Sequence, residues 1–267
     1  KSNDFIEKNL LSQVEKIGEE DTHEYILAFY HACPLIYYYD ISLFESKLAS
    51  IDNVDIHDGC LKSTIDYIFE KQVLNEPFYQ SDSYNYKLSF ADIKSIFNLI
   101  IKFKNDWLIH SYLKRITNVL KLKIKRNEIS SNQQAEINSF FEKIDTLLPI
   151  NGGVKHNGYK LLSKSFHLVF KNEKRTTEWK KLIDSAWNLG NLADSIFTVS
   201  NLLNIANTLP LTVRKDELDT IIARLNTLNF TLEKLDLIEH VAYNCKEICK
   251  NKTKKLLENA INLSVED

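Results

Sequence analysis

A basic segment between residues 107 and 126 holds side chains whose charge and spacing suit ligand binding. It has no acidic residue between Asp106 and Glu128, and its basic residues are Lys114, Arg115, Lys121, Lys123, Lys125 and Arg126. On a helix, at about 100° per residue, Lys114, Lys121 and Lys125 fall within about 40° of one another. Such a face can lie along a phosphate backbone or meet an acidic protein surface.

The candidate binding face for a polyanion or an acidic partner therefore consists of Lys114, Arg115, Lys121, Lys125 and Arg126. Two other interpretations remain open: the charges are solvated, or they pair with acids of the same chain. The first sixty residues carry twelve acids and four bases, so partners within the chain are available.

Tyrosines form a second candidate surface. Tyr79, Tyr84 and Tyr86 lie in an irregular stretch from Asn75 to Lys87. Tyrosine combines a large contact area with a polar tip, so these side chains could anchor an interface. Packing within the core or against the loop is the alternative.

Other reactive side chains lack the spacing that their chemistry needs. His240, Cys245 and Cys249 fall on one expected helix and span about two and a half turns, so they cannot converge on one zinc ion. The segment Gly153–Lys160 approaches a phosphate-binding loop, but Tyr159 stands where the lysine is required and no strand precedes it. We expect a flexible linker there, and we assign no catalytic, cofactor-binding or metal-ligating residue.

The elements that position these side chains are expected to be helices. The 267 residues include only 6 Gly and 4 Pro, too few for the turns of a β protein. One early helix should stop by Pro34, followed by a short extended link or a helix start. Apolar residues at helical spacing predict C-terminal helices near 159–171, 177–190, 192–208, 213–229, 231–248 and 251–263.

The C-terminal helices repeat an apolar pattern. Ile221–Leu228 stands 35 residues before Leu256–Leu263, and Leu202-Leu203 precedes Leu237-Ile238 by the same offset. Residues 159–264 resemble an α-solenoid helical repeat of the HEAT or TPR-like type, without the Trp, Gly, Tyr and Pro signature of TPR units. The resemblance implies an all-α fold of antiparallel helical hairpins stacked as an irregular α-solenoid.

Two domains are predicted: an N-terminal helical domain over residues 1–150, or a continuation of the same superhelix, and a C-terminal helical-repeat domain over 159–267. The segment from Asn151 to Gly158 separates them because it holds three of the six glycines. The chain begins at Lys1 and contains no Met, so we expect it to be a fragment of a larger multidomain protein.

The composition of the chain limits the partners and the cellular location that we expect. The net charge of −2 gives no global steering toward a charged partner. The chain has no apolar run of eighteen residues, so we expect no membrane span, and four cysteines in a chain of this length favour the cytoplasm. The expected function is a non-enzymatic scaffold or sensor region that recognises a protein partner, without a cofactor. Nucleic-acid binding by residues 107–126 and a helical enzyme with a site scattered in sequence are the alternatives.

Overall fold

A computed structural model describes residues 23–70, 88–148, 153–170, 176–207, 209–229 and 231–265. Within these ranges the chain is all-α, with twelve helices and no strand. None of the helices described is long and apolar enough to cross a membrane. The chain divides into two compact units, Lys1–Gln133 and Gln134–Asp267. The predicted separation into domains near residues 151–158 stays a prediction.

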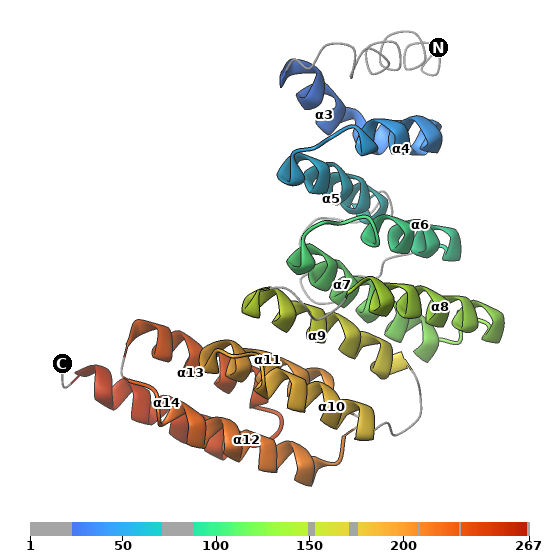
Figure 1. Cartoon of the computed structure of the whole chain (residues 1–267). Helices are drawn as coiled ribbons and strands as arrows, with labels where there is room; N and C mark the ends of the chain where they lie inside the picture. Colours follow the sequence, from blue (N-terminus) through green and yellow to red (C-terminus); the bar gives the residue numbers. More distant parts are fainter. Residues whose placement is uncertain are drawn as a thin grey trace. The chain divides into compact units, whose positions relative to one another are not determined.

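Unit 1 contains five described helices (Figure 1): α3 (His23–Tyr39), α4 (Ile41–Ala49), α5 (Val54–Glu70), α6 (Phe90–Ile100) and α7 (Asp106–Lys125). Their starts follow from local capping. Ser89 and Asp92 form the expected capping box of α6, and the Asn105 side chain accepts a hydrogen bond from the Trp107 amide at the start of α7. Helix α3 packs against both α4 and α5, and α5 packs against α6.

The expectation that a helix ends at Pro34 is wrong. Helix α3 runs through Pro34 to Tyr39. Proline cannot donate a backbone hydrogen bond to the carbonyl four residues earlier, which belongs to Tyr30. The Cys33 thiol donates to that carbonyl at 3.1 Å. A side chain next to the proline thus supplies a hydrogen bond where the backbone donor is missing.

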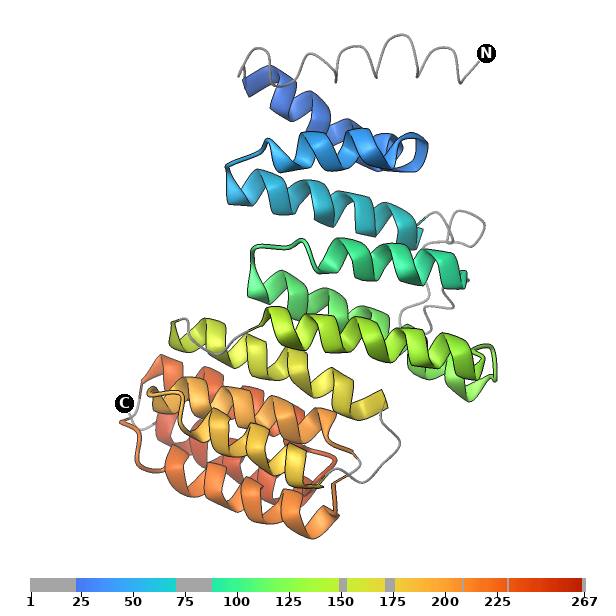
Figure 2. The same ribbon diagram turned by 45° about the vertical axis from the view of Figure 1, so that its right-hand side comes forward.

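Unit 2 contains most of α8 and six further helices: α8 (Ser131–Leu147), α9 (Val154–Phe170), α10 (Thr176–Trp187), α11 (Leu192–Ile205), α12 (Leu211–Leu225), α13 (Leu232–Cys245) and α14 (Lys250–Val265). Helix α11 contacts both α9 and α13, and Figure 2 shows α9, in yellow, above the orange helices that follow it. Helix α10 lies against α9 and α11, α12 against α11 and α13, and α14 against α13. Successive helices therefore alternate between two sets, and α9, α11 and α13 form one of them.

The core of unit 2 lies between the two sets of helices. Trp179, Ile183, Leu202, Leu218 and Val241 are among its fully buried apolar side chains. These residues come from α10 to α13, so no single hairpin completes its own burial.

The helices of unit 2 do not begin at one fixed spacing, since α12 begins 35 residues after α10, at Leu211 and Thr176. Helix α13 begins 40 residues after α11, at Leu232 and Leu192, and α14 begins 39 residues after α12, at Lys250 and Leu211. For α12 and α14, the spacing of the helix starts exceeds the 35-residue offset of the apolar pattern by four residues, about one helical turn. A shift of four residues returns a side chain to nearly the same face of a helix, so the apolar pattern repeats at the shorter offset too.

The expected linker through Gly158 is also corrected by the structure. Helix α9 begins at Val154, five residues before the expected start, and Gly158 lies buried within it. A Cβ atom at Gly158 would stand 2.7 Å from Oγ1 of Thr198 on α11. The missing side chain allows α9 and α11 to approach closely. Glycine serves close helix packing here rather than a flexible connection.

Candidate functional site

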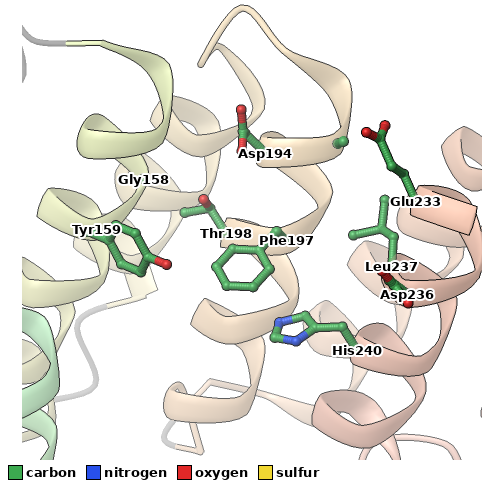
Figure 3. Close-up of a pocket in the computed structure, with 10 residues that line it drawn as sticks. Gly158, Tyr159, Asp194, Phe197, Thr198, Glu233, Asp236, Leu237 and His240 are labelled. Carbon is green, nitrogen blue, oxygen red and sulfur yellow. The ribbon is translucent and has the colours of Figure 1, made fainter. Parts of the chain in front are cut away.

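A pocket of about 490 Å³ opens on the face of unit 2 that α9, α11 and α13 share (Figure 3). A volume of this size is within the range of small-ligand pockets. All of the lining residues come from these three helices: Gly158, Tyr159, Ala193, Asp194, Phe197, Thr198, Glu233, Asp236, Leu237 and His240. The pocket therefore depends on the packing of alternate helices and not on one continuous segment.

Local capping sets where the pocket lies along two of the helices. The Asn191 side chain accepts hydrogen bonds from the backbone amides of Ala193 and Asp194, at 2.8 and 3.2 Å, and begins α11. The Thr231 hydroxyl accepts one from the Lys234 amide at 3.2 Å and begins α13. Asp194 and Glu233 thus lie in the first turns of the two helices, where the helix dipole favours a carboxylate.

Each of the three helices contributes one ring to the pocket. The rings of Phe197 and His240 are stacked, with centroids 4.2 Å apart and planes 19° apart. Tyr159 meets Phe197 at 6.4 Å and 77°, an edge-on arrangement. The side-chain amides of Asn201 and Asn244 each lie 2.8 Å from Nε2 of His240, so hydrogen bonds hold the imidazole against Phe197.

The charge of the pocket is negative. Its lining includes the carboxylates of Asp194, Glu233 and Asp236 and no lysine or arginine. Among the described residues, none of these three carboxylates has an ion-pair or hydrogen-bond partner for its side chain. Burial, and then the nearby Asp194 carboxylate, raise the pKa of the Tyr159 hydroxyl above its usual value. The lining thus combines apolar ring surface with uncompensated negative charge.

The basic face predicted from the sequence lies on α7 in unit 1. Lys114, Lys121 and Lys125 are exposed there. Arg115 is engaged within the chain: it donates to Asp66 on α5 at 2.7 Å and lies 3.9 Å above the centre of the Phe69 ring. Part of this face therefore pairs internally.

The C-terminal end of the basic face is also close to an acid. Arg126 lies 3.9 Å from one oxygen of Glu128, and Lys123 donates to the other at 2.9 Å.

The tyrosines proposed as interface anchors, Tyr79, Tyr84 and Tyr86, lie outside the described residues.

The histidine and the two cysteines predicted on one C-terminal helix do not share one, because α13 ends at Cys245 and Cys249 lies before α14. His240 faces the pocket, whereas Cys245 is fully buried in the core of unit 2. Burial raises the pKa of the Cys245 thiol to about 12, so it stays protonated at neutral pH. In the described part of the chain, no group of three or more His, Cys, Asp and Glu side chains is placed to hold a metal ion.

Sequence patterns alone do not identify the pocket residues as a site. The sequence has one regularity at the pocket: Asn191 with Asp194 and Thr231 with Glu233 repeat a cap followed by an acid, 40 residues apart at the caps. Acids in the first turn of a helix are common because the helix dipole stabilises them, so this pattern alone does not indicate a site. The aromatic partners are separated by 38 and 43 residues, which breaks any regular spacing.

Comparison of the chain with protein-family models, with curated proteins and with solved structures gives no match.

Proposed function

We propose that the chain is a non-enzymatic helical scaffold that recognises a protein partner through the face of α9, α11 and α13. Its architecture in this proposal is an irregular α-solenoid of antiparallel hairpins. The contacts of unit 2 support that arrangement, since α11 lies beside both α9 and α13. Location in the cytoplasm remains part of the proposal.

The pocket is the observation that carries the proposal. It is built by three successive helices of one set, and stacked helical repeats present such faces as extended binding surfaces. A peptide segment that crosses α9, α11 and α13 would meet an aromatic residue on each. Aromatic side chains in pockets are frequent energetic centres of protein interfaces.

Unit 1, taken by itself, has a similar alternation. Helix α3 packs on α5, and Asp66 of α5 accepts hydrogen bonds from Tyr112 and Arg115 of α7 at 2.9 and 2.7 Å. Lys102, just after α6, donates to Glu45 of α4 at 2.8 Å. These links support an N-terminal part built from the same kind of hairpin.

Selection from a displayed library of random twelve-residue peptides tests the proposal. We expect enriched peptides to bind the intact chain and to lose at least tenfold in affinity for Ala193→Trp, which fills the pocket. The matched control is Ala223→Trp, at an exposed position on α12 outside the pocket. Circular dichroism confirms that both variants fold. If no peptide is enriched, or if Ala193→Trp binds like the wild type, this face is not the recognition surface.

Nucleic-acid binding by α7 is the second candidate function, because Lys114, Lys121 and Lys125 are exposed. Binding to duplex or single-stranded DNA or RNA should then weaken steeply with salt. Changing Lys121 and Lys125 to Glu should flatten the slope of log affinity against log salt by about one unit or more. A chain that shifts no nucleic acid in a low-salt gel excludes this function.

A further inference from the structure

The pocket on α9, α11 and α13 has the chemistry to select one kind of side chain within a partner. Figure 3 shows the Phe197 ring in the middle of the pocket, with Tyr159 to one side and Glu233 and Leu237 to the other. The Phe197 ring stacks on the His240 ring, and this contact fixes the position of Phe197. A flat aromatic surface bordered by carboxylates is the usual environment for a bound organic cation.

The charges of the lining exclude an anionic ligand and disfavour a purely apolar one. An anion would meet three carboxylates and no lysine or arginine. An apolar group would desolvate those carboxylates and return no ion pair. A basic side chain contributes both an aliphatic stem for the rings and a charge for the carboxylates.

A stabilising role at a helix start explains only two of the three carboxylates that line the pocket. Asp194 and Glu233 lie in first turns, where they also stabilise their own helices. Asp236 lies beyond the first turn of α13, and among the described residues its side chain neither caps a helix nor pairs with another side chain. Its position in the pocket wall adds a charge that the fold of α13 does not require.

We infer that this pocket receives an arginine or lysine side chain from an extended basic segment of a partner protein. The inference rests on the proposed function, because it names the chemistry of the partner that the scaffold binds. The cationic head group lies against Phe197 and Tyr159 and pairs with Asp236 and Glu233. The affinity of the segment therefore depends on its positive charge as well as on its shape.

Fluorescent octapeptide pools with one fixed central residue test the inference. The fixed residue is Arg, Lys, citrulline or norleucine, and binding to the intact chain is measured by fluorescence anisotropy. Citrulline has nearly the shape of arginine without the charge. We expect the Arg pool to bind at least tenfold more tightly than the citrulline pool at low salt, with the ratio falling at 500 mM NaCl.

Two single substitutions on α13 separate the pocket from the rest of the helix. Asp236→Asn should reduce the Arg-to-citrulline ratio at least threefold. Glu239→Gln removes an exposed acid of the same helix outside the pocket and should leave the ratio unchanged. Equal effects of the two substitutions would assign the preference to general surface charge and overturn the inference.

The outcomes distinguish the inference from the function on which it rests. If the Arg and citrulline pools bind equally well and Ala193→Trp weakens both, the pocket binds peptides but does not select a cation. That result overturns the inference and leaves the proposed function standing. If no pool binds and library display also enriches no peptide, the proposed function fails as well.

Discussion

The imidazole of His240 on α13 stacks on the phenyl ring of Phe197 on α11, with ring centroids 4.2 Å apart. The two residues lie 43 positions apart in the sequence. Their stack joins two helices of the same set and forms part of the lining of the pocket. The relationship links the stability of unit 2 to the shape of the candidate binding site.

A double-mutant cycle measures the strength of this stack. Phe197→Leu and His240→Leu each remove one ring, and urea unfolding gives the free energy of unfolding for each variant and for the pair. We expect a coupling energy of about 1 kcal/mol, the usual strength of a stacked ring pair. The control cycle pairs Phe197→Leu with Tyr243→Leu, an exposed ring on α13, and should show coupling near zero. Equal coupling in the two cycles would contradict the stack.

Gly158→Ala should destabilise unit 2 although alanine favours a helix. In a helix interior the change alone would stabilise by about 1 kcal/mol. The new Cβ would stand 2.7 Å from Thr198 Oγ1, and overpacking of this kind costs about 1–3 kcal/mol. We expect a net loss of about 1 kcal/mol in urea unfolding. In a Thr198→Ala background the hydroxyl is gone, and Gly158→Ala should then stabilise. Destabilisation in both backgrounds would show that another contact limits the approach.

Asp58→Ala should strongly destabilise unit 1. The carboxylate is 2% exposed and accepts hydrogen bonds from the backbone amides of Lys104 and Asn105, at 3.1 and 2.9 Å. It also accepts one from Nδ1 of His57 at 2.8 Å. Its removal leaves these donors without their acceptor, and we expect a loss of about 2–4 kcal/mol by urea unfolding. Asp55→Ala removes an exposed acid of the same helix and should cost less than about 1 kcal/mol. Similar losses for the two variants would exclude a special role for Asp58.

The free energy of unfolding of unit 1 should decrease as the pH is lowered, because of His110. Burial, and then the Lys114 charge, lower the pKa of His110 from 6.5 to about 4. Below pH 6.5 the unfolded chain binds a proton that the folded chain does not bind until about pH 4. Stability is therefore complete above pH 6.5 and is lost through this window, by roughly 3 kcal/mol in full.

The variant His110→Gln isolates this contribution. Urea unfolding of the wild type and the variant is compared from pH 7.5 to pH 4.5, where the other titrating groups contribute equally to both. We expect the stability difference between them to shift by about 2 kcal/mol toward the variant as pH falls to 5. Parallel stability curves would show that His110 titrates normally in the folded state.

Local patterns predicted the helices and several of their ends. Ser89 with Asp92 and Asn105 with Asp106 mark helix starts that the structure confirms. Capping depends on residues within one turn, so the sequence is sufficient to identify it. The C-terminal helices after α9 begin within two residues of their expected starts, because apolar spacing reports the buried face of each helix.

The packing of Gly158 and the pocket could not be predicted from the sequence, because both depend on contacts between residues far apart in the chain. Gly158 suggested a linker because glycine is common in loops, whereas its position opposite Thr198 is visible only once α9 and α11 are packed. The pocket residues have ordinary roles when each helix is considered alone. Asp194 and Glu233 suit first turns, and Phe197 is a partly buried apolar residue beside the core.

By itself, the sequence determined an all-α chain: scarce turn residues, helix caps and apolar spacing act over a few residues and leave little choice of element. Tertiary structure alone decided which faces meet. It engaged Arg115 of the basic segment with Asp66 and Phe69, and it gathered rings and carboxylates from α9, α11 and α13 into one pocket. The physical reason is that helix formation depends on local hydrogen bonds, whereas a site depends on the packing of side chains far apart in the chain.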